Sequence, residues 1–308
     1  MAPPTVVLLA FGGAPASVLC RCAPPSLQLS PRIPALELWP LRCDELRGRL
    51  QLSEEEMWKM VEAVPQALTL GFEEIALSKL DLLQQRLGMS DAELAKVVRR
   101  LPAVLGSSEE AMSKKLNVLQ QRLSLSEVEL SRVVLRLPPV LGYSTEANVL
   151  PTLEALQLRL GLSEAELRKV VLRLPQVLSN TIEVTASKLD ALELRLGLSQ
   201  EELRKVVLQL PSVLSLSIDK NLMPKLDWLQ TELGLSDAAL RESILATPVR
   251  LGVSLEKRYR PRLRACRKAQ ADERKVLTLA SWPDDRFCAS IGVSVDDLAA
   301  CRAVESGR

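Results

Sequence analysis

The sequence predicts an all-α fold, an α-solenoid of tandem helix–turn–helix repeats with short 3₁₀ turns. Two markers with a common period carry this prediction, because self-similarity at a fixed spacing is the signature of repeat architectures. A proline recurs at Pro65, Pro102, Pro138, Pro175, Pro211 and Pro248, and a serine recurs at Ser53, Ser90, Ser126, Ser163, Ser199 and Ser236. Both series advance in steps of 36 or 37 residues, so we expect six units over about residues 49–250.

The first helix of each unit is expected to begin at the serine. In one unit, Ser163 is followed three residues later by Glu166, and this S-x-x-E spacing is typical of a capping box. Apolar residues then recur at helical spacing as a single stripe: Leu167, Val170, Val171 and Leu174. Pro175 ends the helix, because proline lacks an amide hydrogen and disfavours the α conformation of the residue before it. The short Q-V-L-S that follows suits a 3₁₀ turn.

A second helix is expected over roughly residues 183–196. Its leucines Leu189, Leu192 and Leu196 lie at i, i+3 and i+7, and Gly197 supplies the left-handed position that ends many helices. One helix pair cannot bury its apolar stripe alone, so neighbouring units must stack and share a core. Because the proline turns the chain at one fixed point in every unit, we expect the stacked units to form a curved superhelix.

The ends of the chain differ from the repeats. We divide the chain into a disordered organelle targeting segment (residues 1–45), the six-unit array with a basic C-terminal segment (46–270) and a degenerate C-terminal cap (271–308). Residues 1–36 contain no acid, as is typical of transit peptides, which indicates import into the chloroplast stroma or the mitochondrial matrix. A secretory signal is the alternative, because a short apolar core lies near the start, but no basic residue precedes that core.

The composition argues against catalysis. The chain contains no histidine, which removes the commonest general base and most zinc sites. Its six cysteines lie outside the repeats and form no C-x-x-C pair, so neither a metal site nor a disulfide framework is expected. We therefore predict a protein that is not an enzyme and has no catalytic or metal-binding residues. We also expect no cofactor, no small-molecule substrate and no membrane contact.

Arginines recur at two repeat positions, and a basic run follows the last proline. The position before the last leucine of the second helix carries Arg49, Arg86, Arg122, Arg159 and Arg195. The position two residues before the proline carries Arg100, Arg136 and Arg173. The run from 257 to 268 has seven basic residues in twelve, and its candidates are Lys257, Arg258, Arg260, Arg262 and Arg264. We predict that these arrays, from Arg86 onward, form one cationic track that binds phosphates.

A structural explanation stands beside this functional one. Cations near a helix C-terminus offset the helix dipole by about 0.3–1 kcal/mol, and tandem duplication copies a position whether or not it is used. A charge run is most often a solvated face. Residues 49–250 carry 24 basic and 27 acidic residues, so any binding must come from local arrays. Tyr259, inside the basic run, is a candidate for stacking on a base.

Two sequence features resemble the mitochondrial transcription termination factor (mTERF) family. They are the repeated pattern L-x-x-x-V-V-x-x-L-P-x-V-L and the segment Gly252–Arg262, G-V-S-L-E-K-R-Y-R-P-R. The resemblance covers about Leu50–Val304, and Ile291–Cys301 looks like a degenerate half-unit. The resemblance to this family implies repeats of two α-helices and a 3₁₀ helix, a curved superhelix with a basic groove, and import into mitochondria or chloroplasts. It also implies binding of double-stranded DNA or, as in some members, of organelle RNA.

We therefore predict a monomeric organelle protein that binds double-stranded DNA or structured RNA and regulates organelle transcription, by termination or as a roadblock. Two alternatives remain open. One is a protein-binding scaffold, and the other is an RNA-binding factor in splicing or ribosome assembly. Arginine arrays fix a protein on a nucleic-acid backbone but read no bases, so the sequence leaves the choice between DNA and RNA open.

Overall fold

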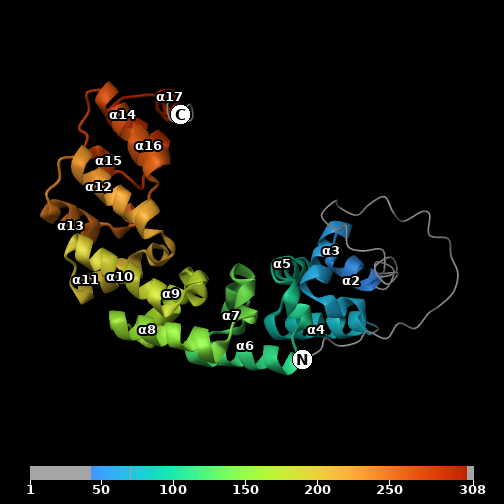
Figure 1. Ribbon diagram of the computed structural model, residues 1–308. Coiled ribbons are helices and arrows are strands. Elements are labelled where there is room, and N and C mark those ends of the chain that lie inside the picture. The colour runs from blue at the N-terminus through green and yellow to red at the C-terminus, as the bar shows by residue number, and fades with distance from the viewer. Residues whose placement is uncertain (1–42, 70, 304–308) are drawn as a thin grey trace, which may run out of the picture.

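The computed structural model describes residues 43–69 and 71–303. Within these residues the chain is helical, with no strand, and the helix pairs follow one another along an arc (Figure 1). The all-α solenoid predicted from the repeat period is thus confirmed. The targeting segment predicted for residues 1–45 lies almost wholly outside the described residues. Among the helices described here, none is both long enough and apolar enough to cross a membrane.

The first helix of each unit begins at the predicted serine. In five of the described units the serine side chain and the N3 glutamate form a capping box, which satisfies backbone amides that lack helical partners. In the sixth, Ser236 accepts a hydrogen bond from the amide of Ala239. These helices are α3 (Glu54–Ala63), α5 (Asp91–Arg100), α7 (Glu127–Arg136), α9 (Glu164–Arg173), α11 (Gln200–Gln209) and α13 (Asp237–Ala246).

A 3₁₀ turn follows each first helix, with the repeat proline at its first position. The residue before the proline leaves the α region, as Leu174 does with φ −134° and ψ 76°, because the proline ring crowds it. These turns are η3 (Pro65–Leu68), η4 (Pro102–Gly106), η5 (Pro138–Leu141), η7 (Pro175–Ser179), η8 (Pro211–Ser215) and η10 (Pro248–Gly252).

The second helix of each unit runs back along the first. The second helices are α4 (Phe72–Leu87), α6 (Glu109–Leu123), α8 (Leu150–Leu160), α10 (Ile182–Leu196), α12 (Met223–Glu232) and α14 (Arg260–Lys268). Gly197 follows α10 with φ 60°, the left-handed conformation expected of a helix stop. Ser124 adopts the same conformation after α6, with φ 48°, although it bears a side chain.

Three second helices are preceded by a π-turn that was not predicted from the sequence. These turns are η6 (Thr145–Val149), η9 (Ile218–Leu222) and η11 (Leu255–Tyr259). Each leads into a helix with a proline at its second residue, namely Pro151, Pro224 or Pro261. A proline ring clashes with the carbonyl four residues before it and donates no hydrogen bond, and a wider turn relieves that clash. The second helices α4, α6 and α10 lack such a proline and begin regularly.

A polar side chain at one repeat position, in most units a lysine, ties the second helix to the next unit. It occupies the position directly before the first core leucine of the helix. Lys79, Lys115, Lys188 and Lys225 donate to the backbone carbonyls of Leu105, Leu141, Leu214 and Leu251. These carbonyls lie near the end of the next 3₁₀ turn, where backbone acceptors lack helical partners. Burial lowers the pKa of Lys225 to about 8. In α8 the position is Thr152, whose hydroxyl donates to the Asn180 carbonyl at 3.2 Å.

Both ends of the array repeat parts of the unit. Before the first unit, α2 (Asp44–Leu50) stops at Gln51, which is left-handed with φ 48°. After the sixth unit come α15 (Lys275–Thr278), α16 (Asp284–Ile291) and α17 (Val295–Ala303). Gly292 ends α16 with φ 74°, and the Ser294 hydroxyl accepts from the Asp297 amide at 3.0 Å. The C-terminal cap (residues 271–303) therefore repeats the glycine stop and the serine cap of a unit.

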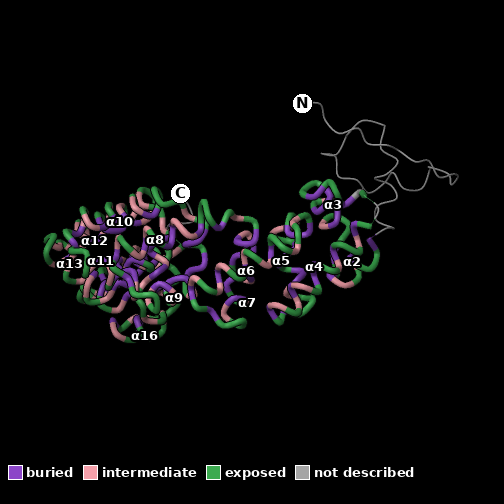
Figure 2. Tube along the Cα trace, turned by 90° about the horizontal axis from the view of Figure 1, so that it is seen from below, coloured by how far each residue is buried: buried purple, intermediate pink, exposed green. Residues whose placement is uncertain are grey.

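The leucine and valine columns form a continuous core, which Figure 2 shows as buried positions recurring in every unit. Val170, Val171 and Leu192 are each 0% exposed. Neighbouring first helices pack directly, α5 on α7, α7 on α9 and α9 on α11. As a result, residues that share a repeat position on these helices are brought into line from one unit to the next.

The capping-box glutamates also link units, which predicts an acid-sensitive contribution to stability. Arg204 donates to both carboxylate oxygens of Glu166, at 2.7 and 2.8 Å. This guanidinium, with the amide and hydroxyl of Ser163, lowers the pKa of Glu166 from 4.5 to about 2. A lowered pKa in the folded state adds stability above the unfolded pKa, and that stability is lost as the pH falls. The window for Glu166 is therefore about pH 4.5 to 2.

We expect the variant E166Q to be less stable than the wild type at pH 7 and the difference to shrink as the pH falls through this window. Urea unfolding at pH 7 and at pH 3 measures the free energy of unfolding of E166Q and of the wild type. The control is E201Q, because Glu201 is an exposed carboxylate on the next first helix, α11, where it pairs with Lys205 of the same helix at 3.6 Å. If the difference in stability between E166Q and the wild type were equal at the two pH values, the ionised Glu166 carboxylate would not be the source of the stabilisation.

Candidate nucleic-acid interface

The Arg86 series lies between units, where each guanidinium reaches acidic or amide side chains of the next one or two units. Arg49 pairs with Asp81 and Asp91, Arg86 with Glu127, Arg122 with Glu164, Arg159 with Asp190 and Glu193, and Arg195 with Asp227 and Asp237. Gln84, Asn117, Gln120, Gln157 and Gln230 accept further hydrogen bonds from the same groups.

These contacts make the series a set of inter-unit staples. The side chain of Arg122 is 20% exposed and that of Arg195 is 21% exposed, so both are largely covered. A guanidinium that already faces carboxylates offers little net positive charge to a phosphate. We therefore leave Arg86, Arg122, Arg159 and Arg195 out of the interface proposed below.

The second arginine series is placed differently. Arg100, Arg136 and Arg173 stand in the last turn of α5, α7 and α9, and all three are exposed. Arg136 donates to the carbonyl of Leu172 at 3.1 Å, and Arg173 donates to the carbonyl of Leu208 at 3.1 Å. These contacts are made to neutral carbonyls, so the positive charges stay uncompensated. Within residues 43–69 and 71–303, no carboxylate forms an ion pair with any of the three.

A second cation column, which was not predicted from the sequence, lies one helical turn before this series. Lys96, Arg132 and Lys169 are exposed and stand four residues before Arg100, Arg136 and Arg173. Residues at i and i+4 share one face of a helix, so α5, α7 and α9 each present two cations side by side. We call these six residues the cation stripe. The sequence held the signal, because all six residues recur at the repeat period.

The cation stripe is bounded along the chain. In the fifth unit its two positions hold Lys205, which pairs with Glu201 at 3.6 Å, and the uncharged Gln209. In the sixth unit they hold Glu242 and Ala246. Uncompensated charge is thus concentrated on the second, third and fourth units, whose first helices lie on the inner side of the arc in Figure 1.

The basic run from 257 to 268 is not a separate tail. It forms η11 and α14, the second helix of the sixth unit, in which Leu263 and Cys266 take the core positions. Arg262 is 0% exposed. It occupies the repeat position of Lys79 and Lys225, directly before the first core leucine. The prediction that Arg262 contacts nucleic acid was therefore wrong, because a fully buried guanidinium cannot reach a phosphate.

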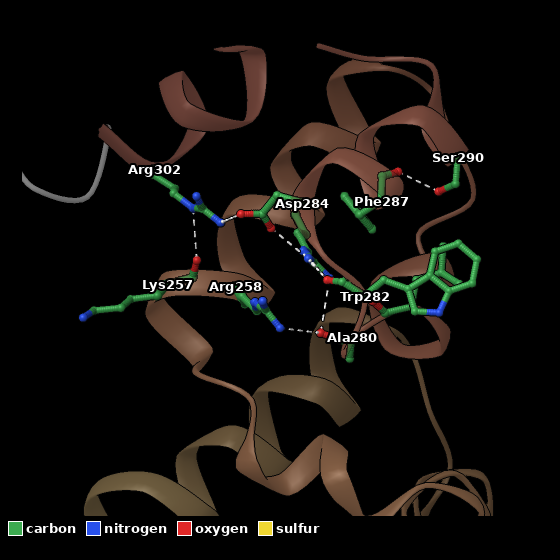
Figure 3. A network of polar contacts seen from close by, with 10 residues as sticks. Lys257, Arg258, Ala280, Trp282, Asp284, Phe287, Ser290 and Arg302 are labelled. Atoms are coloured by element: carbon green, nitrogen blue, oxygen red, sulfur yellow. Dashed lines mark hydrogen bonds and ion pairs between the residues drawn. The ribbon is translucent and has the colours of Figure 1, made fainter. Parts of the chain in front are cut away.

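Arg262 instead holds the C-terminal cap. Its guanidinium donates to the backbone carbonyls of Leu279, Ala280 and Trp282 and to the carboxylate of Asp284 at 2.8 Å. It also lies 4.4 Å from the centre of the Phe287 ring. The same carboxylate accepts a hydrogen bond from Arg302 on α17 at 2.6 Å (Figure 3).

Most other basic residues of this run have partners within the protein. Arg258 donates to the Ala280 carbonyl at 3.4 Å, and Arg264 donates to the Cys301 carbonyl at 2.9 Å. Arg260 pairs with Glu256 at 3.2 Å and lies 5.9 Å from the centre of the Trp228 ring. Lys257 is exposed, and its side chain points away from the network in Figure 3. The run is thus mainly a joint between the array and the C-terminal cap.

Tyr259 also differs from its expected role. The ring is 0% exposed, and its hydroxyl donates to the Arg250 carbonyl at 2.9 Å. Burial raises the pKa of this hydroxyl well above its ordinary value. The suggestion that Tyr259 stacks on a base is therefore wrong, since no base can approach a ring that the core encloses.

Comparison with known proteins agrees with the repeat architecture. The family model for mTERF matches residues 41–126 and 118–288, which include the cation stripe and the whole sixth unit. A search of curated proteins gave no match. The proteins of this family bind nucleic acid in organelle gene expression. Because the matched residues make up more than half of the chain, the chain belongs to the mTERF family.

Proposed function

We propose that this protein binds the backbone of double-stranded DNA through the cation stripe and regulates organelle transcription as a roadblock or terminator. The observation that carries the proposal is the pair of exposed cations on each of three consecutive first helices, none of which forms an ion pair with a described residue. Direct packing of α5 on α7 and of α7 on α9 keeps these pairs in register. A rigid row of cations at regular spacing is suited to a polyanion whose charges are also regularly spaced.

The residues around the cation stripe favour backbone contacts over base reading. The position one turn before Lys96, Arg132 and Lys169 holds Ala92, Val128 and Ala165, which are small and uncharged. Single-stranded nucleic acid is usually held by aromatic side chains that stack on bases. No aromatic residue belongs to the stripe, and Tyr259 is buried. The stripe therefore supports recognition of a duplex through its phosphates.

A titration over a range of salt concentrations tests the proposal. If all six cations of the stripe neutralise phosphates, the logarithm of the affinity for a DNA duplex falls against the logarithm of salt with a slope of about −5. Parallel titrations with duplex RNA and with single-stranded DNA compare the nucleic-acid classes. Tighter binding to duplex RNA would shift the assignment to an RNA factor. A slope near zero for every nucleic acid would overturn the proposal.

We also propose that the protein acts in a chloroplast or mitochondrion. The acid-poor composition of residues 1–36 supports this location. A fluorescent fusion of the full chain is expected to accumulate in one of the two organelles, and a fusion that begins at residue 43 is expected to remain outside. Equal distribution of the two fusions would contradict organelle import by this segment.

A further inference from the structure

Two leucines are exposed at one repeat position of the second helices. Leu158 on α8 is 83% exposed, and Leu194 on α10 is 88% exposed. In the first and second units the same position holds Gln85 and Gln121, which are also exposed. The core therefore does not require leucine at this position. The change from glutamine to leucine is confined to two adjacent units, whose second helices pack on each other.

Each exposed leucine stands at the rim of a hollow between units. Leu158 and Ile182 line a hollow of about 430 Å³ between α8 and α10. Leu194 and Ile218 line a second hollow of about 710 Å³, between α10 and the following unit. Ile182 and Ile218 also share one repeat position. We call this surface the leucine face (Leu158, Ile182, Leu194 and Ile218). It repeats the same apolar pair in two successive units.

The charge next to the leucine face is negative. Arg159 meets two carboxylates, those of Asp190 and Glu193, and Arg195 likewise meets those of Asp227 and Asp237. Each guanidinium compensates one negative charge, so each cluster keeps a surplus of one.

Two further carboxylates add to this surplus. Glu154 lies on α8, one turn before Leu158, and Glu183 lies on α10, directly after Ile182. Both are exposed, and neither forms an ion pair with another described residue. In the first and second units, by contrast, Arg86 and Arg122 each pair with a single carboxylate, Glu127 and Glu164.

We propose that the leucine face is a docking site for a partner protein, which contributes a basic amphipathic helix. Two leucine side chains one unit apart, each beside a hollow, fit the apolar stripe of such a helix. The surplus of carboxylates selects lysine and arginine on the flanks of the helix and disfavours acidic sequences. The same negative charge repels nucleic acid, so the leucine face and the cation stripe take different ligands.

The test uses the full-length protein and two labelled eighteen-residue peptides of identical pattern. One peptide carries leucines on one helical face and lysines elsewhere, and the other has glutamate in place of every lysine. Fluorescence anisotropy measures binding of each peptide to the wild type and to L158Q/L194Q. This variant introduces the glutamine that the equivalent positions Gln85 and Gln121 carry. The control V128Q removes an apolar side chain that is 61% exposed on α7, away from the leucine face.

We expect the lysine peptide to bind the wild type and V128Q equally, and L158Q/L194Q to bind it at least about tenfold more weakly, since the peptide no longer covers two leucine side chains. The glutamate peptide should not bind. Equal affinity of L158Q/L194Q and the wild type, or equal binding of the two peptides, overturns the proposal. Sedimentation that shows a wild-type dimer, dissociated by L158Q/L194Q, would assign the face to a second copy of this chain. The affinity of L158Q/L194Q for duplex DNA and its dependence on salt should equal those of the wild type.

Discussion

Replacing Arg262 with methionine is expected to release the C-terminal cap from the sixth unit. The variant R262M would remove the guanidinium from three backbone carbonyls, of which that of Trp282 has no other donor among the described residues, and would leave Asp284 with Arg302 as its ion-pair partner. A hydrogen bond to a charged group typically contributes about 1.5–3 kcal/mol, and R262M loses several of them. Because contacts in a solenoid run between neighbours, this destabilisation falls on the last unit and the cap.

Limited proteolysis and urea unfolding measure the effect. We expect R262M to be cleaved early between α14 and α17 and to lose a separate fraction of its helical signal at low urea. R262K restores the residue type that Lys225 has at this position and should be intermediate. The control is R286Q, because Arg286 is exposed and stacks on Trp282 within the cap. A cleavage pattern of R262M identical to that of the wild type would show that Arg262 is not the anchor.

Neutralising one column of the cation stripe is expected to cause the largest decrease in affinity for duplex DNA. The variant R100Q/R136Q/R173Q carries glutamine, the residue that the fifth unit has naturally at Gln209. Because this variant neutralises three fewer phosphates, the salt slope should become shallower by about 2.7, and the affinity at 0.1 M salt should fall by roughly 10²–10³-fold.

A matched control separates this effect from a general decrease in positive charge. The variant R86Q/R122Q removes two arginines of the inter-unit staples. It should lower the stability of the array, by up to about 1 kcal/mol for each partly exposed pair, and leave the salt slope unchanged. If R86Q/R122Q reduced the slope as steeply for each arginine as the triple variant, the staples would belong to the interface as well.

The sequence was sufficient to predict the architecture because the signals for it are local. A serine cap acts on amides three residues away, and a proline acts on the residue before it. The first helices, the 3₁₀ turns and the glycine stops therefore follow from short stretches. The π-turns could also have been predicted from the sequence, because each precedes a proline near the start of a second helix.

The roles of the arginines were harder to predict, because they depend on residues of other units. Arg86 and Arg100 recur with equal regularity, yet Arg86 meets Glu127, and Arg100 has no carboxylate partner among the described residues. That difference is set by which helix faces its neighbour, and one helix does not reveal it. Arg262 was misjudged for a different reason. Its repeat position, directly before Leu263, is the one that Lys225 occupies in the fifth unit and indicates burial. The basic residues around it in the sequence suggested exposure instead.

Chemical footprinting of lysines on the unmodified protein tests the role of the cation stripe most directly. The full-length protein is acetylated with and without a DNA duplex, and mass spectrometry measures the extent at each lysine. We expect the duplex to protect Lys96 and Lys169, which belong to the stripe. Lys220 is also exposed, but it lies in η9 beside the leucine face, so its acetylation should stay the same. Protection of Lys220 with unchanged reactivity at Lys96 and Lys169 would place the duplex elsewhere and contradict the proposed interface.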